Sequence, residues 1–138
     1  MGAWGVGPFE NDTASDFVLD LLDADGGLAE LRSTLGHASA SAPEELEAPL
    51  CEASIAAAAL VALGRGALVG QASDRASEWG QRYGHELAVD DVELAIAAAR
   101  MVVACSGLRE LWDESPSAAE WHAAIGRLLG SLEGLRKR

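Results

Sequence analysis

The first regular pattern of apolar and polar positions begins just after residue 10 and predicts an amphipathic helix that ends at the glycines of residues 26–27. Asn11 or Asp12 is expected to cap this helix, because a short side-chain oxygen accepts from the unpaired amides of a first turn. The apolar positions share one face and are Ala14, Phe17, Val18, Leu21 and Leu22. The other side carries the carboxylates of Asp12, Asp16, Asp20 and Asp23.

An alanine-rich stretch near the middle of the chain predicts the centre of the fold. Before it, a short second helix is expected over about residues 28–35, followed by a loop of small residues and proline. Pro49 then suits the first turn of a third helix, where its missing amide costs nothing. This helix is apolar on every side from Ile55 to Leu63, which is typical of the buried centre of a helical bundle.

Three more helices are predicted in the second half of the chain. The fourth carries Trp79 and Tyr83 one turn apart, the fifth is expected over residues 90–114, and the sixth carries Trp121 in an apolar stripe. The expected capping residues, in chain order, are Ser73 or Asp74, then Asp90 with Glu93 as a capping box, then Ser115 with Pro116 as the first helical residue.

The composition agrees with an all-α fold. Hydrophobic residues make up 49% of the chain, yet aromatic residues make up only 5%. Alanine and leucine dominate, and both favour helices, whereas strands favour β-branched and aromatic residues. A chain of 138 residues buries about two-thirds of the surface that it exposes when unfolded. We therefore predict one compact bundle of about six helices over residues 1–138, with residues 1–10 packed against it.

The sequence favours a cytoplasmic protein. No segment reaches the ~18 consecutive apolar residues of a membrane span, and the N-terminus lacks the basic and apolar regions of a signal peptide. Cys51 and Cys105 are isolated in the sequence, so reduced, buried thiols are expected rather than a disulfide.

The opening "MGAWGVGPFE" allows two interpretations. A phosphate-binding loop presents backbone amides at a helix N-terminus, usually after a strand and with a lysine nearby. Here no strand precedes Gly2, Gly5 and Gly7, no lysine follows them, and the acids after residue 9 would repel an anion. The segment is therefore predicted to be a structural plug, in which the glycines let the chain bend while Trp4 and Phe9 insert into the core.

No catalytic, cofactor or metal site stands out, and the sequence favours a role other than catalysis. Neither cysteine has a histidine partner nearby, and the chain has no G-x-S-x-G string. The three histidines lie in different segments without metal-binding spacing. The acids around one helix start can hold a divalent cation, but the helix dipole favours acids there in any case. That group comprises His85, Glu86, Asp90, Asp91 and Glu93.

Two aromatic pairs leave an alternative open. Trp79 with Tyr83, and Trp112 with Trp121, are candidates to line a pocket for an apolar small molecule. Large aromatic side chains more usually pack as core between helices. A small-molecule-binding helical domain, or an unrecognised enzyme with its site near the tryptophans, is therefore the alternative function.

Charge is concentrated at one end of the chain and suggests the leading function. The whole chain has a net charge of −12. Residues 1–52 hold eleven of its 22 acidic residues but only one basic residue, Arg32. Such a surface repels nucleic acid and anionic membranes. Complementary charge steers association with a basic protein, as when an acidic immunity protein neutralises a toxin. We therefore expect a protein-interaction or adaptor module whose interaction face consists of Asp12, Asp16, Asp20 and Asp23.

The opening "MGAWGVGPFENDTASDF" also resembles the N-terminal signature of a bacterial family called domain of unknown function 4259. Two later stretches resemble its alanine-rich central helix and its C-terminal helix pair, namely "LEAPLCEASIAAAALVALGRG" and "SGLRELWDESPSAAEWHAAIGRL". The resemblance covers most of the chain and implies no established activity. It leads us to expect a glutamate in the central helix, where this chain has Ala58 or Ala59.

Overall fold

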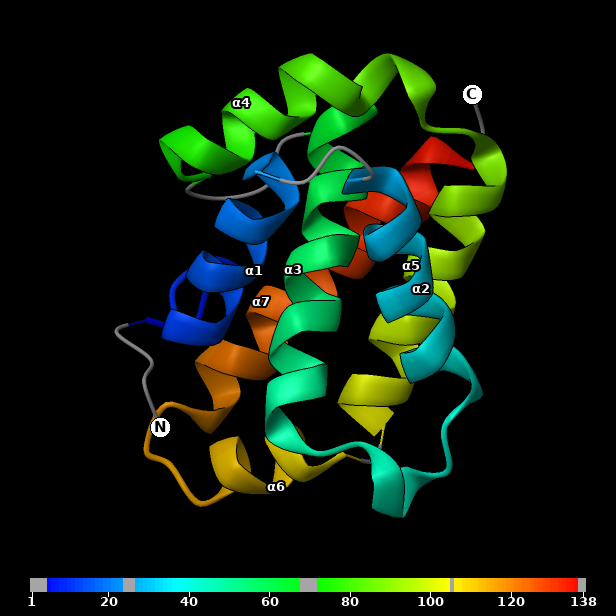
Figure 1. Cartoon of the computed structure of the whole chain (residues 1–138). Coiled ribbons are helices and arrows are strands. Elements are labelled where there is room, and N and C mark those ends of the chain that lie inside the picture. The colour runs from blue at the N-terminus through cyan, green and yellow to red at the C-terminus, as the bar shows by residue number, and fades with distance from the viewer. Residues whose placement is uncertain (1–4, 24–26, 68–71, 105, 137–138) are drawn as a thin grey trace.

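A computed structural model describes residues 5–23, 27–67, 72–104 and 106–136, and within them the chain is helical (Figure 1). The all-α prediction is thus confirmed. In chain order the elements are α1 (Asp12–Asp23), α2 (Gly27–Ala40), the 3-10 turn η1 (Pro43–Glu45), α3 (Ala48–Gly64), α4 (Asp74–Tyr83), the 3-10 turn η2 (Gly84–Glu86), α5 (Val89–Ala104), α6 (Gly107–Asp113) and α7 (Ala118–Leu135).

Helix α3 forms the centre of the bundle, as its all-round apolar sequence predicted. Every residue from Ile55 to Ala62 is buried, and all six other α-helices contact this helix. Figure 1 shows α1 on one side of α3, α2 and α5 on the other, and α4 across one end. Alanine suits this position because its small side chain lets several helix backbones approach at once.

The described chain has seven α-helices rather than six, because the predicted fifth helix is two helices, α5 and α6. Ser106 lies between them, in an extended conformation, and is the N-cap residue of α6. Its hydroxyl donates to the carbonyl of Val102 over 2.7 Å and accepts from the amide of Arg109 over 3.0 Å. The next amide, that of Gly107, donates to the carbonyl of Leu46 over 2.8 Å. This tie to the loop before α3 takes the chain out of helical geometry.

Two helix boundaries differ from the predictions, one at a glycine and one at a proline. Helix α2 continues to Ala40, past Gly36, because Ala38 still has a buried position to fill. Pro116 precedes α7, which begins two residues later. Ser115, the residue before Pro116, accepts a hydrogen bond from the amide of Ser117 and is not the N-cap residue of α7.

The predicted caps are partly confirmed. Asn11 accepts from the amide of Ala14 over 2.7 Å, and Ser73 accepts from that of Ala76 over 3.2 Å. The capping box of Asp90 and Glu93 is wrong. The carboxylate that reaches back to the start of α5 belongs to Asp91, which accepts from the amide of Ala88 over 2.9 Å.

Two glycines allow α3 and the chain after α4 to approach each other closely. A Cβ atom on Gly84 would lie 2.5 Å from the carbonyl oxygen of Gly64, a distance at which one backbone must move. Trp79 of α4 lies against this crossing and is fully buried. No helix among the described residues is long and apolar enough to cross a membrane.

Candidate functional site: an acidic face on α1 and a recess at Glu52

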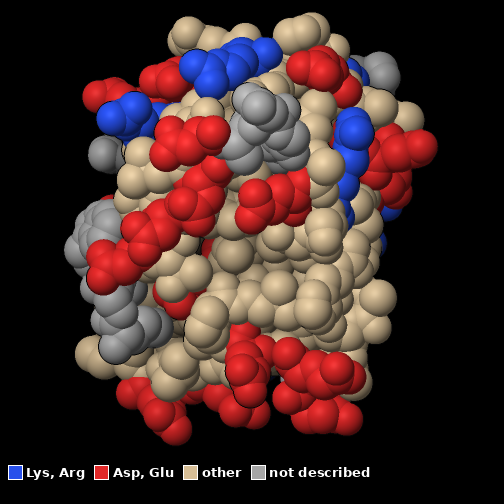
Figure 2. All heavy atoms as spheres, viewed as in Figure 1, with Lys and Arg blue, Asp and Glu red and all other residues tan. Residues whose placement is uncertain are grey.

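The four aspartates predicted as an interaction face are all exposed along α1. Their helix buries its opposite side, from Ala14 to Leu22, against the core. Figure 2 shows the acidic side chains as a nearly continuous stripe over this helix. Among the described residues, no basic side chain forms an ion pair with Asp12, Asp16, Asp20 or Asp23.

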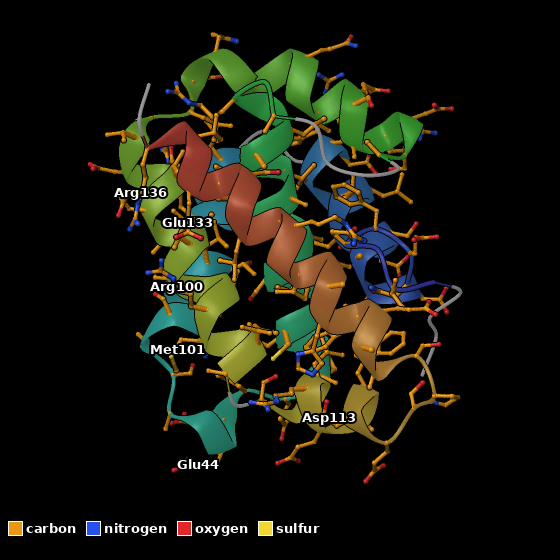
Figure 3. The ribbon with its side chains drawn as sticks, turned by 180° about the vertical axis from the view of Figure 1, so that it is seen from behind. Glu44, Arg100, Met101, Asp113, Glu133 and Arg136 are labelled. Carbon is orange, nitrogen blue, oxygen red and sulfur yellow. The ribbon has the colours of Figure 1, made fainter. Side chains whose placement is uncertain are left out.

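Acids elsewhere are more often matched with bases. Arg100 of α5 pairs with Glu133 of α7 over 3.0 Å, and Arg136 pairs with Glu93 of α5. Figure 3 shows Arg100, Glu133 and Arg136 together along these two helices. The acids of the stripe on α1 therefore lack the basic partners that Glu133 and Glu93 have.

Arg32 does not compensate the stripe, because Asp91 already holds it. Its Nε and Nη2 atoms donate to the two carboxylate oxygens of Asp91 over 2.8 and 3.0 Å. Burial of Asp91 opposes ionisation, but the hydrogen bonds from Arg32 and from the Ala88 amide outweigh it, so the pKa of Asp91 lies below its ordinary value. The bridge joins α2 to α5.

A small recess lies beside the start of the acidic face. It is lined by residues 5–8, by Asn11, by Glu52 of α3 and by Trp112 and Trp121 of α6 and α7, among others. Its cavity volume is about 10 Å³, which is about the room that one water molecule needs. The recess is partly open to solvent.

Glu52 is the chemically unusual residue of this recess. It is the only charged residue of α3, and its exposed fraction is 8%. Burial raises the pKa of its carboxyl. A hydrogen bond with Thr13 and the positive charge of the chain's N-terminus lower this pKa in part, and the negative charge of Asp12 adds to the rise. Glu52 is not among the site residues predicted from the sequence. A single acid in an otherwise apolar helix is the signal that could have found it.

The glycine-rich segment before α1 binds the carboxylate of Glu10, which follows it in the chain. The amide of Gly7 donates to Oε1 of Glu10 over 3.0 Å, and a Cβ atom on Gly5 or Gly7 would come within 2.4 Å of that carboxylate. The glycines thus give room to an internal acid. Phe9 is buried in the core as predicted. The predictions for Gly2 and Trp4 concern residues outside the described part of the chain.

The two aromatic pairs have different surroundings. Trp79 is fully buried, and its ring centroid lies 5.5 Å from that of Tyr83, so this pair packs between helices. The rings of Trp112 and Trp121 are nearly parallel, with an interplanar angle of 10° and centroids 6.3 Å apart. This second pair belongs to the core and also lines the recess.

The acids and histidines named for metal binding do not converge. Asp91 contacts Arg32, Glu93 contacts Arg136, and His85 lies 3.9 Å from Glu86. In the described ranges no three His, Cys, Asp or Glu side chains are placed to hold a metal ion. Cys51 is buried, which raises the pKa of its thiol, and Cys105 lies outside those ranges.

A comparison with protein-family models decides the family. The model described as a domain of unknown function, DUF4259, matches residues 2–124. The chain belongs to this family. No curated protein and no solved structure matches it. In this DUF4259 chain, Ala58 and Ala59 of the central helix are fully buried, and the buried carboxylate of that helix belongs to Glu52.

Proposed function

We propose that this chain is a protein-interaction module that binds a basic protein through the acidic face of α1. The observation that carries the proposal is the exposure of Asp12, Asp16, Asp20 and Asp23 without an ion-pair partner among the described residues. Like charges one helical turn apart repel each other by a few tenths of a kcal/mol per pair. A basic partner relieves that repulsion and gains charge-assisted contacts.

The size of the recess supports this function over the alternative of a small-molecule pocket. Sites for drug-sized ligands enclose about 300–1,000 Å³, whereas the recess beside Trp112 and Trp121 has a volume of about 10 Å³. Trp79 is buried in the core and Tyr83 packs against it, with the two ring planes tilted by 38°. The tryptophans therefore favour a structural role with, at most, a site for a very small group.

The proposal predicts how charge reversal changes binding rates. After a pull-down with the whole chain from its native cells, the captured basic protein would be tested against the double variant Asp16→Lys/Asp20→Lys. We expect about tenfold slower association at low salt and little change in dissociation, because exposed charges act mainly on the encounter. Stopped-flow or surface-plasmon measurements give both rates. Raising salt should slow wild-type association in the same way.

The matched control is Glu44→Lys. Glu44 lies on η1, on the side of the molecule opposite α1 (Figures 1 and 3), and is also exposed. This variant changes the net charge by the same amount per residue but leaves the stripe intact, so its association rate should stay within about twofold of wild type. Equal association rates for wild type and the double variant would contradict the proposal.

A further inference from the structure

We propose that residues 5–7 form a lid on the recess at Glu52, and that one hydrogen bond, from the amide of Gly7 to the carboxylate of Glu10, latches this lid shut. Release of the latch opens the recess to solvent. The lid thereby sets whether the buried carboxyl group of α3 is dry or hydrated. This device is independent of the proposed function, since it needs neither the acidic face nor a partner.

The lid lies beside the buried carboxyl group. Gly5, Val6 and Gly7 line one side of the recess, and Glu52 is among the residues that line the rest of it. Glu52 is more than nine-tenths buried, and the closed recess has room for about one water molecule. The lid is therefore part of the cover that keeps bulk water away from this carboxyl group.

The lid has few contacts that hold it to the bundle. Its hydrogen bonds to described residues lie within residues 7–10: the amide of Gly7 donates to Oε1 of Glu10 over 3.0 Å, and the amide of Glu10 donates to the carbonyl of Gly7 over 3.1 Å. Val6 packs against the core but is only partly buried. A segment with so few buried contacts and hydrogen bonds opens locally at a lower free energy than the core does.

The residues that follow the lid are firmly anchored. Phe9 is 5% exposed and belongs to the core, and the side chain of Asn11 accepts from the amide of Ala14 in the first turn of α1. Gly7 thus lies between a buried anchor and a segment that is only partly buried. Hinges are often small residues at the end of an element, so movement about Gly7 can open the lid and leave the helices unchanged.

The latch fits closely against the backbone of the lid. A Cβ atom on Gly7 would lie 2.4 Å from Oε1 of Glu10, and one on Gly5 would lie 2.4 Å from Oε2. Hydrogen bonds to an ionised carboxylate are about twice as strong as neutral ones, so this contact is a large part of what holds the lid. A methyl group at residue 7 would push the carboxylate away and break the latch. The φ angle of Gly7 is not positive, so the backbone does not oppose this substitution.

Gly7→Ala tests the lid through the ionisation of Glu52. An NMR titration of the Glu52 carboxyl carbon in the whole chain measures its pKa, which burial raises while the lid is closed. Hydration should lower this pKa, and we expect about half of the rise to disappear in the variant. Moving the positive charge of the N-terminus away from Glu52 would act in the opposite direction, but burial is the largest cause of the shift.

Hydrogen exchange of the Gly7 amide gives a second measurement. In the wild type this amide should exchange at least about tenfold faster than the amides at the centre of α3, because the lid opens without unfolding the bundle. Glu10→Ala removes the latch from its other side and should lower the protection of the Gly7 amide about tenfold. Gly134→Ala is the matched control and should change neither measurement, because its Cβ meets no atom within 4 Å beyond the neighbouring backbone of its own helix.

Two results would overturn the lid. The first is an unchanged pKa of Glu52 in folded Gly7→Ala, which would mean that the recess stays dry without the latch. The second is exchange of the wild-type Gly7 amide at the rate of the α3 amides, which would mean that residues 5–7 open only when the whole protein unfolds. Should Gly7→Ala fail to fold, Glu10→Ala decides through the exchange measurement, and unchanged protection of the Gly7 amide would then overturn the latch.

Discussion

Replacing Arg32 by methionine is expected to lower the free energy of unfolding by about 2–3 kcal/mol at neutral pH. The substitution keeps a long apolar stem but leaves the carboxylate of Asp91, whose side chain is 6% exposed, without its cation. Breaking a buried pair on one side costs about 3–5 kcal/mol. We take less than that range because the Arg32 side chain is 45% exposed and water screens part of the interaction. Denaturant unfolding followed by circular dichroism would measure the change.

The same bridge has a pH signature. The pKa of Asp91 is lower in the folded protein than its ordinary value of about 3.9. The contribution of the bridge is therefore complete above that ordinary value and is lost as the pH falls through the folded-state pKa. Acidification below about pH 4 should remove this increment from the wild type, while Arg32→Met, which lacks it, should change less.

Arg75→Met is the matched control for Arg32. Arg75 lies 3.9 Å from Glu78 on the surface of α4, and both side chains are about half exposed or more. Such surface pairs contribute about 0–1 kcal/mol, so this variant should unfold almost as the wild type does. An equal loss of unfolding free energy in the two variants would show that the bridge between α2 and α5 contributes no more than a surface ion pair.

The triple variant Gly36→Ala/Gly126→Ala/Gly130→Ala is expected to gain about 1.5–3 kcal/mol of stability. Glycine inside a helix costs about 0.5–1 kcal/mol relative to alanine, because it loses more backbone entropy on folding. At none of these three positions does the added Cβ come within 4 Å of an atom beyond the neighbouring backbone of its own helix, and none has a positive φ. Calorimetry should show a melting temperature raised by roughly 5–12 °C.

Gly84→Ala is the opposite case and serves as the control. Its Cβ would lie 2.5 Å from the carbonyl oxygen of Gly64, so this substitution should destabilise the protein while the triple variant stabilises it. A triple variant that melts at or below the wild-type temperature would contradict the prediction and would mean that a Cβ atom at one of these positions meets an obstacle.

These glycines also show what the sequence can predict. Local signals are enough to find α1, α3 and α4. Helix α1 has an amphipathic pattern, α3 has an apolar run on every side, and α4 has a capping residue and two aromatic residues one turn apart. Gly36 gave a wrong stop, since a glycine can remain inside a helix whose next turn still buries Ala38. The break at Ser106 was missed because its cause, the hydrogen bond from Gly107 to Leu46, joins residues that are distant in sequence.

The candidate site divides in the same way. The exposed aspartates of α1 follow from periodicity within one helix, and their exposure was predicted correctly. The recess is lined by side chains from α3, α6 and α7 together with the segment before α1. No local sequence pattern predicts that these elements lie close together. Glu52 has a sequence signal of its own, a single acid in an otherwise apolar helix, but the many other acids of the chain hide this signal. The sequence likewise does not predict that Arg32 pairs with Asp91, because the two residues are 59 positions apart.

The bridge between Arg32 and Asp91 also has a consequence for synthesis on the ribosome. The two residues are 59 positions apart, and a ribosome adds about 5–20 residues per second. Arg32 therefore emerges roughly 3–12 s before its partner. During that interval the acidic first third of the chain lacks the contact that ties α2 to α5, and α2 has only α1 and α3 to pack against. A growing chain in this state has a strongly negative, incompletely packed surface, which self-repulsion keeps apart from neighbouring copies on the same messenger.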